Sequence, residues 1–166
     1  MKILISPFAQ NLRNGKDNPK NFPYWPELVA KLLDAGFDVV QIGSLKDTPI
    51  KYEYYSLHDH VGTFSFEQNL KLKEVASLIK ECDVWISVDS FLQHLNQYYT
   101  KKRGIVIFSQ SDPKHFGYPL NNNLLKDKKY LREKQFWLWE QCEYNKDAFV
   151  TAEEVYINVL KELRME

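Results

Sequence analysis

The sequence has few cysteines, no excess of charge of either sign and no long apolar run. Its two cysteines, Cys82 and Cys142, lie far apart and form no CxxC pair, so neither a disulfide framework nor a zinc knuckle is expected. The 22 basic and 22 acidic residues cancel, which leaves no overall positive field for nucleic acid or anionic lipid. Any partner is therefore recognised locally, and no nucleic-acid binding is expected.

The apolar runs, such as residues 105–108, are much shorter than the roughly 20 residues that cross a membrane. The chain begins with a strand-like Met1-Lys2-Ile3-Leu4-Ile5 and shows no signal-peptide pattern. We therefore expect a cytoplasmic protein without a membrane span. Because 44% of its 166 residues are hydrophobic and 27% are charged, one soluble domain over residues 1–166 is expected.

Apolar periodicity predicts alternating strands and helices along the chain. Strands are expected at 2–6, 37–42, 84–88 and 104–108, with a short one near Val61 in the irregular stretch 43–66. Helices are expected at 25–33, 72–79, 91–99, 128–142 and 151–163, the first with Pro26 in its first turn and Gly36 just past its end. This alternation predicts an α/β fold, a mostly parallel, doubly wound sheet with helices on both faces.

Three predicted strands run into polar segments. The strand 84–88 is followed by Asp89 and Ser90, the strand 104–108 by residues 109–112, and the strand 2–6 by a long polar loop that contains Lys20. In a parallel α/β sheet the ligand lies at the carboxyl ends of the strands, so these segments are the candidate binding loops. The chain is therefore expected to bind a small molecule.

The same segments carry a resemblance to a known family. Residues 72–90 form a helix and a strand that end in Asp89-Ser90, His94 follows four positions later, and residues 107–113 read Ile-Phe-Ser-Gln-Ser-Asp-Pro. Residues 20–26 read Lys-Asn-Phe-Pro-Tyr-Trp-Pro before the first helix. In order and spacing, most of residues 1–118 resembles the family 9 glycosyltransferases, the heptosyltransferases of lipopolysaccharide synthesis. That family carries Lys-x-Trp-Pro, Asp-Ser/Thr-Gly-x-x-His and a Gly-Pro-Thr-Asp-Pro-like turn.

The resemblance implies a single Rossmann-like domain, similar to the carboxyl-terminal, donor-binding half of a GT-B glycosyltransferase. By position, Lys20 would meet the diphosphate, Asp89 and Ser90 would lie in the turn that receives the phosphates, and His94 would face the same site. The free N–H groups and partial positive charge of a helix that begins after Ser90 favour phosphate binding. The implied ligand is a nucleotide or nucleotide-sugar, with no further cofactor.

Each of these residues also has a structural interpretation. Asp89 and Ser90 are good N-cap residues, Lys20 is of a type that is usually solvated in a polar loop, and His94 is compatible with a core position. A further set is expected to form a wall of the pocket or a plain turn before Pro113: Ser109, Gln110, Ser111 and Asp112.

Phe91 stands where the family has glycine, so a ring occupies a place where backbone would approach the diphosphate. The resemblance also assigns no catalytic residue, because in that family the general base belongs to the acceptor lobe. A second chain or a symmetry mate is expected to supply that lobe.

Other clusters carry weaker signals. His58, Asp59 and His60 are too few for a metal site, and none is expected. Tyr52, Tyr54 and Tyr55 either stack on a nucleobase or pack under an irregular loop. A solvated helix face is expected for five basic residues: Lys126, Lys128, Lys129, Arg132 and Lys134.

Three functions are consistent with the sequence. The favoured one is a glycosyltransferase-like domain that binds a nucleotide-sugar and depends on a partner lobe for transfer. The alternatives are a non-catalytic nucleotide-binding or sequestering protein, and a structural domain that has lost the site. Phe91 favours the last of these.

Overall fold

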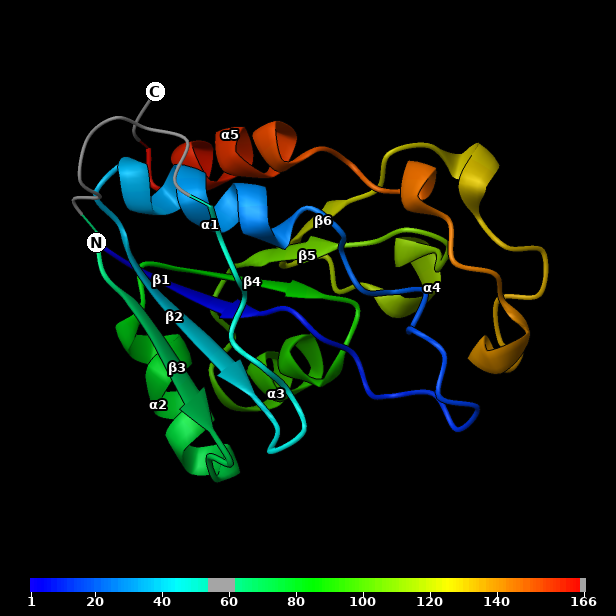
Figure 1. Ribbon diagram of the computed structural model, residues 1–166, viewed down its shortest axis with the longest axis horizontal. Coiled ribbons are helices and arrows are strands. Elements are labelled where there is room, and N and C mark those ends of the chain that lie inside the picture. The colour runs from blue at the N-terminus through cyan, green and yellow to red at the C-terminus, as the bar shows by residue number, and fades with distance from the viewer. Residues whose placement is uncertain (54–61, 165–166) are drawn as a thin grey trace.

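Six parallel strands form one open sheet in the computed structural model, which describes residues 1–53 and 62–164 (Figure 1). The strands are β1 (Lys2–Ser6), β2 (Asp38–Gly43), β3 (Phe64–Gln68), β4 (Val84–Val88), β5 (Ile105–Ile107) and β6 (Asn122–Leu124). Their order across the sheet is β3-β2-β1-β4-β5-β6, and every neighbouring pair is parallel. The prediction of a doubly wound parallel sheet is confirmed.

Helices cover both faces of the sheet (Figure 1). One face carries α1 (Trp25–Asp34) and α5 (Ala152–Glu162), and the other carries α2 (Leu72–Glu81) and α3 (Phe91–Tyr99). The shorter helices are α4 (Pro113–Phe116) and the 3₁₀ turns η1 (Lys128–Tyr130), η2 (Trp139–Gln141) and η3 (Lys146–Ala148). Within residues 1–53 and 62–164, no helix has the length and apolar character needed to cross a membrane.

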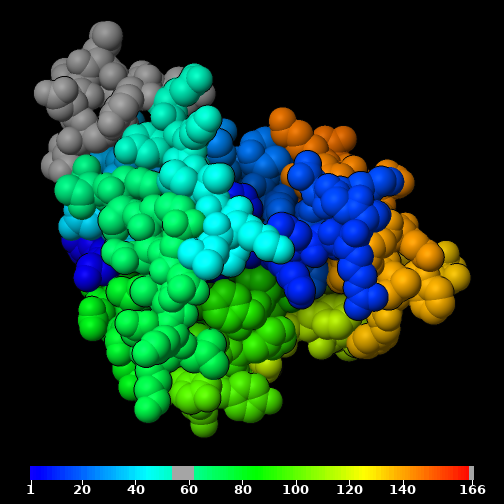
Figure 2. All heavy atoms as spheres, turned by 60° about the horizontal axis from the view of Figure 1, so that its bottom comes forward, coloured from blue at the N-terminus to red at the C-terminus, as the bar shows by residue number. Residues whose placement is uncertain are grey.

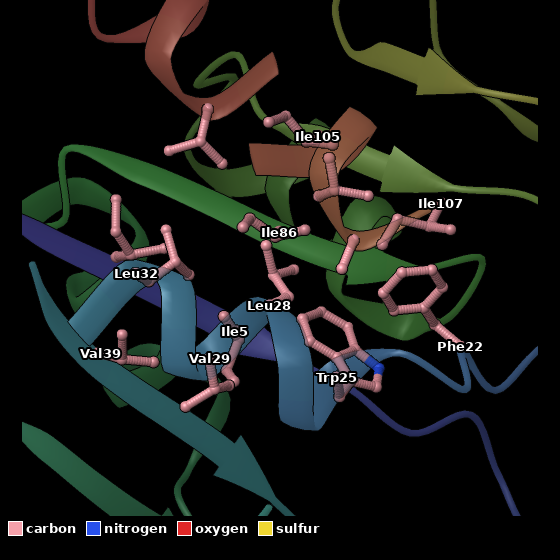
Figure 3. Close-up of a cluster of buried hydrophobic side chains, with 14 of the residues drawn as sticks. Ile5, Phe22, Trp25, Leu28, Val29, Leu32, Val39, Ile86, Ile105 and Ile107 are labelled. Carbon is pink, nitrogen blue, oxygen red and sulfur yellow. The ribbon is translucent and has the colours of Figure 1, made fainter. Parts of the chain in front are cut away.

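An apolar core lies between each face of the sheet and the helices that pack on it. Along β1, Ile3 and Ile5 face the core under α1 and α5, whereas Leu4 faces the core under α2 and α3. Figure 3 shows the first core, in which Leu28 and Leu32 of α1 point toward the strands. Because β1 is buried on both faces, its three central residues, 3–5, are all apolar.

The first helix begins and ends as its sequence predicts. Pro26 lies in the first turn, where its missing N–H costs nothing. Gly36 follows the helix in the left-handed region with φ 82°. The N–H of Gly36 donates to Leu33 O (3.0 Å) and the N–H of Phe37 donates to Leu32 O (3.1 Å), which closes the helix and directs the chain into β2.

The expected helix at 128–142 is wrong. This stretch contains only η1, η2 and irregular backbone. Arg132, which was expected on a solvated helix face, is partly buried and donates to the carbonyl oxygens of Gln135, Trp137 and Leu138. The carbonyl groups of Gln135 and Trp137 are thus bonded to a side chain, while Leu138 O also accepts from the N–H of Gln141 (3.3 Å) in the short turn η2.

Of the two edge strands, β3 was expected close to its position and β6 was not expected. β3 lies at Phe64–Gln68, three residues beyond Val61, which is outside the described residues. β6 reads Asn-Asn-Leu and carries no apolar pattern, yet it pairs with β5. By contrast, α5 is found within the expected 151–163, with Thr151 and Glu154 forming a capping box at its start.

Candidate functional site

A cleft of about 810 Å³ opens at the carboxyl ends of β1 and β4. The chain leaves β1 toward α1 on one face and leaves β4 toward α3 on the other, so the two loops diverge and leave a space between them. Figure 2 views the side on which the blue segment after β1, the cyan segment after β2 and green α3 meet. Residues 137–140 complete the lining.

The loop between β1 and α1 is ordered by its own asparagines. Asn18 donates from Nδ2 to Gln10 O (2.7 Å) and accepts at Oδ1 from the N–H of Lys20 (3.0 Å). Asn21 Oδ1 accepts from the N–H of Ala9 (2.8 Å). These bonds fix the backbone that carries Lys20, so the lysine is not a freely solvated loop residue.

Lys20 is directed into the cleft and forms an ion pair there. Its Nζ lies 3.1 Å from Asp89 Oδ2, and the two side chains are 20% and 4% exposed. Lys20 Nζ also lies over the ring of Trp139, 4.9 Å from its centroid. The fold thus brings together the lysine and the aspartate that the resemblance places at one site.

The carboxylate of Asp89 is surrounded by donors. Besides Lys20, Gln93 donates from Nε2 to Oδ1 (2.7 Å) and Ser111 donates from Oγ to Oδ2 (2.9 Å). A buried carboxylate requires such partners, because its desolvation is otherwise expensive. The buried Asp89 carboxylate therefore holds Lys20 in place, and Lys20 is one of the charged residues that line the cleft, together with Arg13, Lys46, Asp47 and Glu140.

The amino end of α3 borders the cleft beside Lys20. Ser90 is the N-cap residue in extended conformation, but its side chain makes no capping hydrogen bond. Ser90, Phe91 and His94 all line the cleft. Phe91 is 49% exposed, so its ring stands at the wall of the cleft and is not packed into the core.

His94 is exposed, which excludes the core interpretation of this residue. Its Nδ1 lies 2.8 Å from the hydroxyl of Tyr118, and the two rings meet edge to face with centroids 5.5 Å apart. Tyr118 therefore fixes the orientation of the imidazole at the cleft.

The residues after β5 lie behind the cleft and do not line it. Ser109 donates to Pro19 O (3.1 Å), next to Lys20, and Ser111 donates to Asp89. Gln110 donates from Nε2 to Glu143 O (2.9 Å), while Asp112 caps α4 by accepting from the N–H of Lys114 (2.9 Å). Of the four residues expected as a wall, Ser109 and Ser111 thus bond to residues at the cleft from behind, whereas Gln110 and Asp112 bond to segments outside its lining.

The wall that sequence reasoning missed is residues 137–140. The guanidinium of Arg132 lies 3.6 Å from the ring centroid of Trp139, and burial lowers the pKa of Arg132. Glu140 contacts the loop after β1 through its backbone and its side chain, because Asn14 Nδ2 donates to Glu140 O and the N–H of Arg13 donates to Glu140 Oε1, both at 3.4 Å. Backbone hydrogen bonds, including the one from Arg13, keep the pKa of Glu140 below its usual value.

Several expected residues lie outside the described part of the chain: Tyr54, Tyr55, His58, Asp59 and His60. Tyr52 is described and packs against Phe64, with ring centroids 5.4 Å apart, which agrees with its packing interpretation. Within the described ranges, no three His, Cys, Asp or Glu side chains are grouped as they would be around a metal ion.

The cleft lies at the switch point of the sheet, which is the place between β1 and β4 where the strand order reverses direction. This position and the strand order define a Rossmann-like α/β fold. A sequence model of glycosyltransferase family 9 (heptosyltransferase) matches residues 1–143, and the chain belongs to this family.

Two solved heptosyltransferases share the fold. The chain is 17% identical to E. coli heptosyltransferase WaaC, solved with ADP, with a TM-score of 0.59; the match covers 96% of this chain and 44% of WaaC. It is 18% identical to the dodecameric iron-containing heptosyltransferase TibC, solved with ADP-D-β-D-heptose, with a TM-score of 0.63; the match covers 99% of this chain and 45% of TibC. The chain thus spans less than half the length of either protein. A search of curated proteins found no significant match.

Proposed function

We propose that this chain is the donor-binding half of a family 9 glycosyltransferase and binds the diphosphate of a nucleotide or nucleotide-sugar in the cleft. The observation that carries the proposal is the position of Lys20, whose Nζ is fixed by Asp89 next to the amino end of α3. A cation beside free helical N–H groups at a switch point is an arrangement that attracts phosphate oxygens. The nucleotides bound to WaaC and TibC support the same ligand class.

We also propose roles for the other residues that line the cleft. Ser90 makes no side-chain cap, so its own helix leaves N–H groups of the first turn for a ligand. Lys20 would contribute a charge-assisted hydrogen bond to a phosphate oxygen, and His94, oriented by Tyr118, would contribute a second polar group. The half-exposed ring of Phe91 does not fill the cleft, which disfavours the alternative of a structural domain that has lost its binding site.

Sugar transfer requires an acceptor and a general base that reaches its hydroxyl. Asp89 is committed to Lys20, Gln93 and Ser111 and is therefore not our candidate base. We propose that a second lobe or a second chain supplies the base and the acceptor site, and that the described cleft supplies donor affinity. The cytoplasmic location expected from the sequence remains a prediction.

The test is calorimetric titration of the protein with ADP and with ADP-D-β-D-heptose, followed by GDP, UDP and CDP. We expect at least one of these ligands to bind, and Lys20→Met to weaken that binding by about tenfold, because a charge-assisted hydrogen bond to phosphate is lost. Lys16→Met is the matched control, since Lys16 lies in the same loop but not in the lining of the cleft.

Absence of binding by every diphosphate would contradict the proposal. An equal loss of ligand affinity in the Lys20→Met and Lys16→Met variants would show that affinity depends on the net charge of the loop and not on the position of Lys20. That result would contradict the assigned site. Tight binding without transfer, after an acceptor lobe is added, would favour the non-catalytic nucleotide-binding protein.

A further inference from the structure

Three consecutive large apolar side chains are exposed beside the cleft. Phe136 is 78% exposed, Trp137 53% and Leu138 55%. Exposed apolar groups that stand together in a soluble protein mark a surface that a ligand or partner covers. We call residues 136–138 the apolar strip.

The apolar strip is held by a dedicated framework. Arg132 donates from one terminal nitrogen to Gln135 O (2.7 Å) and Trp137 O (2.8 Å), and from the other to Leu138 O (3.5 Å). Gln135 is itself fixed, because its Oε1 accepts from the N–H of Asp112 (2.7 Å). The exposure of these side chains is thus imposed by a hydrogen-bonded loop.

The apolar strip divides into two parts. Phe136 turns toward α4 and packs against Phe116, with ring centroids 5.2 Å apart. Trp137 and Leu138 line the cleft, as does the half-exposed ring of Phe91 at the start of α3. The cleft therefore has an apolar, aromatic portion in addition to its charged centre.

This portion adjoins the proposed phosphate position. Trp139, the next residue after Leu138, lies under Lys20 Nζ at 4.9 Å, so the apolar portion begins where the lysine ends. The opposite side of the cleft is formed by the end of β2, where Asp47 accepts from the N–H of Ser44 (2.6 Å). In dinucleotide-binding folds a carboxylate after the second strand is the partner of the ribose, which places the nucleoside on the β2 side.

A ligand that extends from the β2 side across Lys20 would reach the apolar strip with its other end. A sugar ring suits this position, since its C–H faces stack on aromatic rings and its hydroxyl groups bond to polar neighbours. Glu140 and His94 line the same cleft and supply such neighbours.

We propose that Trp137, Leu138 and Phe91 form the subsite for the sugar ring of a nucleotide-sugar, and that this subsite distinguishes the sugar-bearing donor from the free nucleotide. The inference rests on the proposed function. It assigns the selectivity for the sugar-bearing ligand to these three residues.

The experiment compares calorimetric titrations of ADP and of ADP-D-β-D-heptose in wild type, Trp137→Ala, Leu138→Ala and Trp137→Phe. We expect wild type to bind the ADP-sugar about tenfold more tightly than ADP. Trp137→Ala and Leu138→Ala reduce that ratio, because they weaken binding of the ADP-sugar more than binding of ADP, whereas Trp137→Phe keeps most of it. Phe136→Ala is the matched control, because this side chain belongs to the apolar strip but packs on α4.

Different outcomes separate this inference from the proposed function. Failure of wild type to bind either ligand would overturn both. Binding of ADP with no gain from the sugar, or an equal loss of both ligands in Trp137→Ala, would overturn the inference alone. Sedimentation that shows self-association, lost equally in Phe136→Ala and Trp137→Ala, would mean that a second copy covers the apolar strip and would also overturn it.

Discussion

Asp89 is the buried residue that holds Lys20 at the cleft. Its buried carboxylate accepts from Lys20, Gln93 and Ser111, so its negative charge is fully used inside the protein. A phosphate beside Lys20 would therefore meet a carboxylate whose oxygens already accept from three donors within the protein. In the proposed function Asp89 would be a positioning residue, because it would act on a ligand through Lys20.

We predict that Asp89→Asn destabilises the protein and weakens ADP binding. The amide places an N–H group among donors that all require an acceptor, and the expected loss in the free energy of unfolding is about 2–3 kcal/mol. Lys20 also loses its ion-pair partner, so ADP affinity falls together with stability. Urea unfolding and calorimetric titration measure the two effects.

The control for this prediction is Asp83→Asn. Asp83 accepts from the N–H of Lys2 (2.7 Å) at the amino ends of β1 and β4, whereas the cleft lies at their carboxyl ends, so we expect this variant to leave ADP affinity unchanged. Normal ADP affinity in Asp89→Asn would show that Asp89 supports the fold without positioning Lys20.

The segment between β6 and α5 contains little regular structure, but side-chain hydrogen bonds hold it in one conformation. Arg132 bonds to three carbonyl groups of the segment and stacks on Trp139, and Gln110 joins the segment to the end of β5. Its conformation is therefore set by a few side chains. Removing one of them should affect the whole segment.

We predict that Arg132→Lys loosens residues 127–143. An ammonium group lacks the planar set of donors that reaches several carbonyl groups and stacks on an indole, so the substitution is not conservative here. The expected cost is about 1–2 kcal/mol, with faster proteolysis within the segment and altered tryptophan fluorescence. Lys134→Met serves as the control, because Lys134 only lies over the exposed ring of Trp137, at 5.6 Å. Equal proteolysis of the two variants would contradict the role of Arg132.

At the level of elements, the strongly periodic segments were predicted and the irregular ones were not. β1, β4, α1 and α3 have apolar residues at the spacing of their structure, together with end signals such as Pro26 and Gly36. Residues 128–142 carry mixed charges and aromatics that resemble a helix. In consecutive positions, however, Phe136, Trp137 and Leu138 cannot share one helical face, and this was the signal that could have corrected the prediction.

The candidate site was predicted in part. The sequence order places Lys20, Asp89, Ser90, Phe91 and His94 after strands that end at one edge, and all five line the cleft. The Lys20–Asp89 ion pair and the wall at 137–140 could not be derived, because they join residues far apart in the chain and depend on how side chains pack. Binding by these residues remains a prediction.

The stability of the whole molecule should depend on pH through Cys82. Burial raises the pKa of this thiol from 9.0 to about 11. The unfolded chain ionises its thiol first, so stability is fully present below pH 9 and is lost as the pH rises through the folded pKa. The loss attributable to Cys82 is about 1 kcal/mol at pH 10.

Urea midpoints between pH 8 and pH 10.5 measure this dependence. Cys82→Ala should flatten the alkaline decline, while Ser77→Ala, an exposed substitution in α2, should keep the wild-type slope. Identical slopes in Cys82→Ala and wild type would rule out the thiol as the titrating group.

The junction between β1 and β4 also has a kinetic consequence. It joins Ile3 to Val84, so the two central strands meet only after a loop of about 80 residues has closed. Such distant pairing slows folding, because chain entropy is lost before contacts compensate for it. The cleft is made from the loops on either side of this junction, so it cannot form before the junction does. If the cleft binds a nucleotide as proposed, binding during refolding would report that β1 and β4 have paired.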